Sequence, residues 1–405
     1  MKVLYIVGTN LTKNTSANMS HNAYVQGLIE SGHNVDIIME SDSWGAQDKL
    51  LKRLEEARYF EFGAQSFADK IRKKFSHAGR ASAVADPEQA DSSAPAEQKK
   101  NIKQAVRDLV KRVFYRLFPQ DKLYPLDKTW LKKASAFKNN EKYDLVISNS
   151  SPAASHTLAG ILIEKGGVRT DRWIQIWEDP WYYDLYGGHT EAEKDEEKSL
   201  LHAAQEICYV SPITLMYQKR YFPDCADKMK YAPLPYLDFA SPSDAQVIPA
   251  SFGYFGDYYK VTRNLLPFYE ALKATGYKGF IYGDGDLSLA SDDNIEVSGR
   301  VTLDVLDAVQ NKTQVLVHLC NLRGGQIPGK VYHYSATDKP ILFILDGTEE
   351  EKRLLREFFG QFDRYCFCEN NAEDIRAAMD RIVREGKPFS PVTAFSPKEV
   401  VKRIL

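Results

Sequence analysis

The chain has 405 residues, of which 43% are hydrophobic and 27% are charged. This length allows two or three domains with their own cores, and the composition excludes a disordered or fibrous protein. The formal net charge of -2 gives no sign of a nucleic-acid-binding protein. The five cysteines have neither zinc-ligand nor disulfide spacing, so we expect reduced thiols and no metal site.

The N-terminal part predicts the start of an α/β domain. In chain order we expect a buried strand at residues 3–7, a polar loop at 8–20, a helix through Leu28 and a second strand at 35–39. This order indicates a right-handed βαβ unit. The first apolar run is too short for a signal peptide, and no run is long enough to cross a membrane. We therefore expect a cytoplasmic protein.

Residues 45–135 interrupt this alternation. Residues 79–100 contain almost no large apolar side chain, which predicts a mobile loop. Residues 99–118 place apolar side chains at helical spacing among lysines and arginines, which predicts a basic amphipathic helix. Such a helix can lie on an anionic membrane surface, or it can pack on its own domain with a solvated basic face. The sequence leaves both interpretations open.

The α/β alternation resumes after this interruption and continues almost to the end of the chain. Strands are expected at 143–148, 173–177, 207–210, 251–256, 279–282, 295–301, 315–319 and 341–345, with helices at 264–274, 302–310 and 397–405. Residues 233–250 are rich in proline, serine and alanine, which is typical of a linker between domains. We therefore predict an α/β fold with two Rossmann-like, doubly wound domains that face a cleft.

A glycine-rich turn at residues 324–329 precedes a short predicted helix. Glycines let the backbone approach a ligand closely, and a helix start offers free N–H groups that favour anionic oxygens. Lys330 lies in the first helical turn, where its ammonium group can reach a phosphate. On local chemistry alone, a phosphate-binding loop and an ordinary strand-to-helix loop both remain open.

The order of residues in this segment resembles the Pro-Ser-Lys-Leu-x-Glu-Tyr-x-Ala-x-Gly-Lys-Pro signature of the family-four GT-B glycosyltransferases. The matching positions are Pro328, Lys330, Val331, Tyr332, His333, Tyr334, Ala336, Lys339 and Pro340. The resemblance covers most of the chain except residues 45–135. It implies an acceptor domain at 1–240 with an insertion at about 45–135, a nucleotide-sugar domain at 241–390, and a C-terminal helix at 391–405 that packs back on the first domain.

The expected donor site lies at the carboxyl ends of the strands in the second domain, where open parallel sheets bind ligands. Arg263 matches a basic residue that family members keep for the diphosphate, and together with Lys330 it would neutralise a pyrophosphate without a metal. Taken alone, Arg263 is equally consistent with a surface position on a helix. No cofactor is expected besides the nucleotide-sugar co-substrate. The expected nucleotide-sugar-binding residues are Gly256, Arg263, Gly283, Arg300, Gly325, Gln326, Lys330 and His333.

Two positions depart from the family pattern. The glutamates of the usual Glu-x7-Glu motif are replaced by Gly325 and His333. Two interpretations of His333 stay open: a neutral ring nitrogen accepts the ribose hydrogen bonds that the second glutamate accepts, or the site meets a different sugar-nucleotide. The first glutamate has no counterpart unless Gln326 takes its place, and Asp257 stands where an arginine is common. The donor and the stereochemical outcome therefore remain open.

The acceptor side is expected in the first domain. The loop of Gly8, Thr9 and Asn10 would face the cleft and meet acceptor hydroxyls or the donor diphosphate. Asp179, or its neighbour Glu178, would act as a general base after strand 173–177, and the ring of Trp181 would stack on a sugar. The alternative for the two carboxylates is a helix cap or a structural ion pair.

The resemblance implies a metal-independent glycosyltransferase that moves a sugar from a nucleotide-sugar to a glycan or lipid-linked acceptor. The expected setting is bacterial surface polysaccharide synthesis, with residues 99–118 on the inner face of the cell membrane. The loss of both glutamates supports an alternative, a catalytically degenerate GT-B module that binds glycan or scaffolds an assembly complex. A Rossmann oxidoreductase is disfavoured because no Gly-x-Gly-x-x-Gly follows the first strand.

Overall fold

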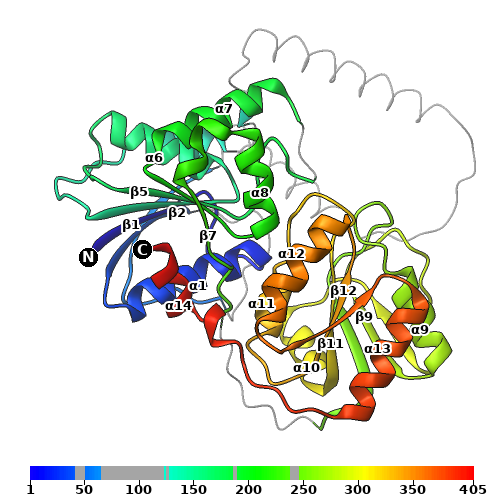
Figure 1. Ribbon diagram of the computed structural model, residues 1–405. Coiled ribbons are helices and arrows are strands. Elements are labelled where there is room, and N and C mark those ends of the chain that lie inside the picture. Colours follow the sequence, from blue (N-terminus) through cyan, green and yellow to red (C-terminus); the bar gives the residue numbers. More distant parts are fainter. Residues whose placement is uncertain (42–50, 65–122, 125–126, 186–188, 238–245) are drawn as a thin grey trace, which may run out of the picture.

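The computed structural model describes residues 1–41, 51–64, 123–124, 127–185, 189–237 and 246–405. The loop expected at 79–100 and the basic helix expected at 99–118 lie outside these ranges. The described residues form two α/β domains that lie side by side, with the first half of the chain in one and most of the second half in the other (Figure 1).

The first domain is built on a seven-stranded sheet in the order β3-β2-β1-β4-β5-β6-β7, with every strand pair parallel. Its strands are β1 (Lys2–Val7), β2 (Asn34–Glu40), β3 (Arg58–Phe62), β4 (Leu145–Ser150), β5 (Trp173–Trp177), β6 (Glu206–Tyr209) and β7 (Met229–Tyr231). Its α-helices are α1 (Ser16–Glu30), α5 (Lys128–Ala134), α6 (Ala154–Glu164), α7 (Glu191–Ala203) and α8 (Pro212–Tyr221), followed by the 3-10 helix η1 (Pro223–Lys228). The central strands are apolar runs because helices cover both faces of the sheet.

The second domain has a six-stranded parallel sheet in the order β10-β9-β8-β11-β12-β13. Its strands are β8 (Ile248–Phe255), β9 (Lys278–Tyr282), β10 (Ile295–Ser298), β11 (Thr313–Leu319), β12 (Ile341–Leu345) and β13 (Tyr365–Glu369). Its helices are α9 (Leu266–Thr275), α10 (Leu303–Lys312), α11 (Lys330–Tyr334), α12 (Glu349–Gly360) and α13 (Ala372–Glu385), and the 3-10 helix η2 (Thr393–Phe395) precedes the last helix, α14 (Pro397–Ile404).

In both sheets the strand order reverses next to the first strand, between β1 and β4 and between β8 and β11. Ligands of doubly wound sheets bind at this switch point, beyond the carboxyl ends of the strands. The predicted α/β fold with two doubly wound domains is confirmed. A continuous cluster of buried apolar side chains crosses from Val210 and Leu234 of the first domain to Val331 and Tyr332 of α11.

Part of the region expected to interrupt the first domain belongs to its sheet. Strand β3 pairs in parallel with β2, and the rings of Phe60 and Phe62 pack against Phe137 with centroids 4.8 and 6.4 Å apart. Residues 58–62 form a short strand at the edge of the sheet, so only part of each side chain is covered and the apolar signal is weak. The prediction missed this strand for that reason, and it also extended β10 by three residues beyond Ser298.

Helix α14 follows the second domain in sequence but packs on α1 of the first domain (Figure 1). Arg172 donates to the carbonyl of Leu405 at 2.8 Å, and Lys230 donates to the carbonyl of Ile404 at 2.5 Å. Cations are favourable at this position because the last carbonyls of a helix lack partners within the helix. The chain therefore connects the two domains twice, once before the second domain in the sequence and once after it.

Gly27 sets how closely these two helices approach, and its replacement by alanine is expected to destabilise the protein. A Cβ at this position would lie 2.2 Å from the carbonyl oxygen of Pro397, so α14 would have to move. Overpacking of this kind costs about 1 to 3 kcal/mol of unfolding free energy. Urea denaturation of Gly27→Ala should show a lower midpoint, whereas Gly360→Ala, with no atom within 4 Å of the new Cβ, should not. Equal midpoints would contradict the tight contact.

Candidate functional site

Lys330 is the first residue of α11 and lies close to the boundary between the domains. The preceding residue, Gly329, approaches the first domain so closely that a Cβ there would lie 3.4 Å from both Ser16 Oγ and Leu234 Cδ1. Ser16 is the first residue of α1, whose free N–H groups carry partial positive charge. The segment that resembles a phosphate-binding signature therefore faces a helix N-terminus across the boundary.

The charge state of Lys330 is sensitive to its surroundings. Burial, and then the positive charge of Arg300, lower the pKa of Lys330 to about 8, while Asp257 acts in the opposite direction. Arg300 pairs with Asp284 at 3.1 Å and also with Asp257. Asp257 stands where the family pattern has an arginine, and here it partly offsets the positive charge at the ends of β8, β9 and β10.

Arg263 adds a third cation at the same edge of the sheet. Its Nη1 lies 3.8 Å from the position that a Cβ of Gly256 would occupy. Burial, and then Arg263, lower the pKa of the His318 ring to about 3, so His318 is neutral. Arg263, Arg300 and Lys330 thus lie at the same edge of the second sheet, and a joint role of Arg263 and Lys330 in diphosphate binding stays a prediction.

Gly256 and Gly283 have a structural role that needs no ligand. Gly283 has a φ of +153°, and a Cβ on it would lie 2.0 Å from the carbonyl oxygen of Gly256. Only glycine lets the two strand ends approach so closely. The close packing accounts for Gly283 by itself, and a role of either glycine in donor binding stays a prediction.

The His333 ring is already engaged on one side. Its Nδ1 accepts a hydrogen bond from the backbone N–H of Leu237, at 3.4 Å. Burial, and then Lys330, lower its pKa to about 3, so the ring is neutral. With Nδ1 as an acceptor, Nε2 carries the proton and acts as a donor. His333 would therefore donate to a ribose oxygen, in contrast to the acceptor role that the sequence suggested.

Gly325 contacts the first domain. Its carbonyl oxygen accepts hydrogen bonds from Ser211 Oγ at 2.6 Å and Thr214 Oγ1 at 3.2 Å, at the start of α8. Its φ is +71°, and a Cβ would lie 2.8 Å from Ile213 Cγ2. No room remains for a glutamate side chain in this arrangement, which gives a physical reason for the departure from the Glu-x7-Glu pattern.

Gln326 reaches further into the first domain and contacts the candidate base. Its Nε2 donates to Asp179 at 2.5 Å and to Asp184 at 3.0 Å, and its Oε1 accepts from the backbone N–H of Leu185 at 3.0 Å. Burial raises the pKa of Asp179 to about 6, the hydrogen bond from Gln326 lowers it, and Asp184 raises it. Asp179 therefore titrates close to neutral pH, as suits a general base.

Glu178 and Asp179 point to opposite sides of the chain after β5. The Glu178 side chain is only 8% exposed and lies 3.4 Å from His21 Nδ1, in a buried cluster that includes Tyr5 and Asn149. Burial, and then Asp179, raise the pKa of Glu178 well above its usual range, while burial lowers that of His21 to about 3. Both groups are therefore neutral, and Asp179 is the better placed of the two predicted acids.

Asp179 lines a cavity of about 280 Å³ at the carboxyl ends of β4 and β5. Two tryptophan rings, Trp177 and Trp181, border it, and Trp181 lies 5.3 Å from the ring of Tyr124. None of the described residues that line the cavity is a lysine or an arginine, whereas several are acids. The full lining is Leu123, Tyr124, Asp127, Ser150, Ser151, Pro152, Ala153, Ala154, Trp177, Asp179, Pro180, Trp181, Asp184 and Glu193.

Polar groups of the loop after β1 form hydrogen bonds with other residues of the first domain. The N–H of Gly8 donates to Ser155 Oγ at 2.8 Å, and a Cβ on Gly8 would lie 2.7 Å from Pro152. The Asn10 side chain accepts from Thr12 and donates to the carbonyl of Ser41 at 3.3 Å. These contacts account for Gly8 and Asn10 structurally, and acceptor binding by Gly8, Thr9 and Asn10 stays a prediction.

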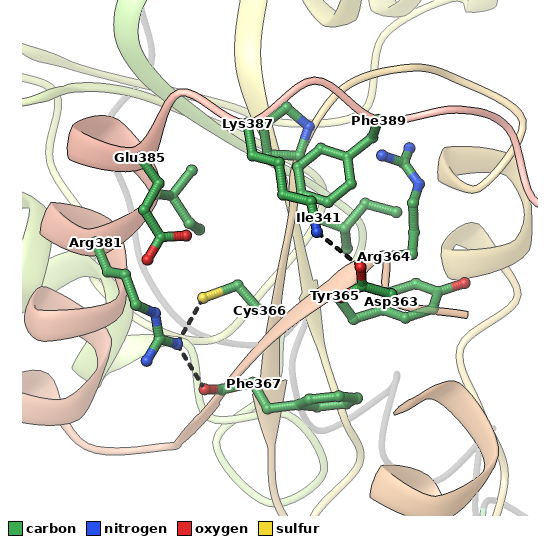
Figure 2. A pocket seen from close by; sticks show the side chains of 12 residues that line it. Ile341, Asp363, Arg364, Tyr365, Cys366, Phe367, Arg381, Glu385, Lys387 and Phe389 are labelled. Carbon is green, nitrogen blue, oxygen red and sulfur yellow. Dashed lines mark hydrogen bonds and ion pairs between the residues drawn. The ribbon is translucent and has the colours of Figure 1, made fainter. Parts of the chain in front are cut away.

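Figure 2 shows a second cavity, of about 320 Å³, whose lining includes none of the candidate site residues. It is lined by Ile341 and Tyr365, the first residues of β12 and β13, and by Arg381, which donates to Cys366 Sγ at 2.8 Å. It therefore opens at the amino ends of the strands, opposite the edge that carries Lys330 and Gln326. We place the functional site at the carboxyl ends, where the cations and Asp179 lie.

Some residues of the site were missed in the sequence. No motif in the sequence indicates a role for Ser211, Thr214 or Asp184. Asp184 lies in an irregular segment after β5 without a motif, so only the folded chain shows that it meets Gln326. Among the described residues, no group of three or more His, Cys, Asp or Glu could hold a metal ion.

Sequence comparison gives no relatives, because no family model and no curated protein match the chain. Several solved structures do match its whole length at low identity. Sucrose-phosphate synthase from Thermosynechococcus elongatus has a TM-score of 0.57 and 12% identity over 100% of this chain and 94% of that chain. AviGT4, a glycosyltransferase involved in avilamycin A biosynthesis, has a TM-score of 0.52 and 11% identity over 100% of this chain and 95% of that chain.

A third match is the E. coli trehalose-6-phosphate protein bound with UDP-2-fluoro glucose. Its TM-score is 0.51, with 12% identity over 100% of this chain and 96% of that chain. At such identity the likeness concerns the fold, which is two parallel sheets with flanking helices. The chain therefore has the GT-B glycosyltransferase fold.

Proposed function

We propose that the protein is a glycosyltransferase that moves a sugar from a nucleotide-sugar to a glycan or lipid-linked acceptor. The observation that carries this proposal is the placement of Arg263, Arg300 and Lys330 in the second domain, near the boundary where Gln326 meets Asp179 of the first. Cations suit a diphosphate, and a carboxylate suits an acceptor hydroxyl. The binding of UDP-2-fluoro glucose by a protein of the same fold supports a nucleotide-sugar donor.

In the proposed mechanism, Arg263 and Lys330 hold the diphosphate of the donor, and the N-terminus of α1 adds partial positive charge. When the bond from the anomeric carbon to the diphosphate breaks, negative charge grows on the departing oxygen, and Lys330 stabilises it. The acceptor oxygen bonds to the anomeric carbon, and Asp179 takes its proton. The side chains supply the positive charge, so a metal ion has no part in the proposed mechanism.

The cavity at Asp179 is the proposed acceptor site. The ring of Trp181 provides an apolar surface for the face of a sugar ring, and the carboxylates accept hydrogen bonds from hydroxyls. The acidic lining opposes phosphate or carboxylate groups on the acceptor at this position. An uncharged, hydroxyl-rich acceptor group fits these surroundings.

We propose that the transfer takes part in surface polysaccharide synthesis at the inner face of a bacterial membrane. Residues 99–118, which would supply the membrane contact, lie outside the described part of the chain. Within that part, no helix combines the length and the apolar character needed to cross a bilayer. The contact with the membrane is peripheral in this proposal.

A thermal-shift screen with UDP, GDP, CMP and dTDP tests the donor site. A ligand that binds only the folded protein raises its apparent stability, by about 2.7 kcal/mol at 100 times Kd. We expect one nucleoside diphosphate to raise Tm, and the matching nucleoside monophosphate, which lacks the second phosphate, to raise it less. Hydrolysis of the corresponding nucleotide-sugar would then show turnover.

The second candidate is a GT-B module that binds glycan without transferring sugar. It is favoured by Gly325 and His333, because neither supplies the carboxylate that is usual at its position. No nucleotide shift and no hydrolysis of any sugar nucleotide, together with glycan binding, would support this module and contradict the transferase.

A further inference from the structure

The side chain of Gln326 joins the donor domain to three groups of the acceptor domain. Its Nε2 donates to one carboxylate oxygen each of Asp179 and Asp184, at 2.5 and 3.0 Å. Its Oε1 accepts from the N–H of Leu185 at 3.0 Å. This set of partners needs a donor and an acceptor on one side chain, which an amide provides and a carboxylate does not. Gln326 thus matches its partners chemically.

The position of Gln326 depends on the contact between the two domains. The hydroxyls of Ser211 and Thr214 hold the carbonyl of the neighbouring Gly325. Further along the same boundary, Arg220 pairs with Glu350 at 2.9 Å, and Tyr217 donates to Glu351 at 3.2 Å. If the domains separate, the amide leaves Asp179, because Asp179 belongs to one domain and Gln326 to the other.

The surroundings of Asp179 explain why it needs a donor. Asp184 lines the same cavity, and its negative charge acts on Asp179. Burial and the negative charge of Asp184 both favour the protonated form of Asp179, and the hydrogen bond from Gln326 favours the ionised form. A carboxylate must be ionised to take a proton from a hydroxyl, so the amide acts in the direction that catalysis requires.

We propose that Gln326 is a positioning residue through which closure of the donor domain prepares Asp179 to act as the base. The ionised, oriented form of Asp179 is then favoured only while the two domains are closed. In this way the enzyme avoids activating the acceptor before the donor domain is in place. The inference rests on the proposed transferase function and adds a means of regulating its base.

The pH dependence of transfer tests this role with two variants. In Gln326→Ala, Asp179 loses a donor, and we expect the acidic limb of the kcat/KM profile to move up by about one pH unit. In Gln326→Glu, a third carboxylate adds repulsion, so the limb should move at least as far and the domains should separate. Separation is measured by the radius of gyration in small-angle X-ray scattering. For a shift of one unit, the loss of activity should be roughly fivefold near pH 6, should approach tenfold at lower pH, and should shrink as the pH rises.

Glu350→Gln is the matched control, because it removes the exposed ion pair with Arg220 at the same boundary but leaves Asp179 untouched. Its acidic limb should stay in place. If the Gln326 variants lose activity equally at every pH, or lose none, the positioning role is wrong while the transferase stands. If the wild-type protein neither binds nor turns over any nucleotide-sugar, the proposed function itself fails. A cooperative thermal unfolding transition and an unchanged far-UV circular dichroism spectrum will show that each variant folds.

Discussion

Lys330→Ala is expected to lower sugar transfer by about 100- to 1,000-fold while the protein remains folded. Lys330 is the first residue of α11 and follows Gly329, which lies against the start of α1, and its ammonium lies within the electrostatic reach of Arg300 and Asp257. Removing one preorganised charge of this kind acts mainly on the transition state, so kcat should fall more than the affinity for the nucleotide. Steady-state kinetics with the donor found by thermal shift will measure both.

Lys273→Ala is the control for Lys330→Ala, since Lys273 is exposed on α9 of the same domain and should tolerate the change. The pH dependence gives a second check. The pKa of Lys330 is lowered to about 8, so the free protein carries this charge below pH 8 and loses it above. Nucleotide binding should weaken above that pH in the wild type but not in the variant. Normal sugar transfer by Lys330→Ala would contradict the proposed role of Lys330 in binding the diphosphate.

Asp179→Asn is expected to reduce kcat by about 100- to 10,000-fold, the range for loss of a general acid or base. Asparagine keeps the shape of the side chain but cannot take a proton from the acceptor. Because the donor ligands lie in the other domain, the thermal shift produced by the nucleotide should persist. In the wild type, activity should fall as the pH drops below about 6, where Asp179 becomes protonated.

Glu178→Gln separates the two predicted acids. Glu178 is buried beside His21, and its raised pKa keeps it protonated, so an amide should replace it with a much smaller loss of transfer. The informative comparison is the ratio of kcat between the two variants. If Glu178→Gln were inactive and Asp179→Asn active, the assignment of the base would be reversed.

The fold was largely predictable from the sequence because most strands are buried on both faces. Such strands are short apolar runs, as at residues 341–345 or 173–177, and they stand out from the helices between them. Strand β3 was not predicted, because it lies at the edge of the sheet and its side chains are only partly covered. The order of the elements then limits the topology, since crossovers between parallel strands are right-handed.

The placement of a site residue was predictable where the residue follows a strand of its own sheet. Asp179 follows β5, and Lys330 begins the helix after β11, so both lie at the carboxyl edges of the sheets, while their roles stay predictions. The roles of Gly325 and Gln326 were not predictable, because their partners lie more than a hundred residues away in the other domain. A pattern within one segment describes its local shape, whereas contacts across a boundary depend on how the two sheets meet.

The packing of α14 on α1 has a consequence for how the protein is made. Val401 and Ile404 of this helix are buried within the core cluster of the first domain, although the whole second domain precedes them in the chain. A nascent chain that has emerged only as far as residue 390 therefore leaves the apolar side of α1 uncovered. The first domain to be synthesised is the last to be completed, and its final stability arises only after the second domain has left the ribosome.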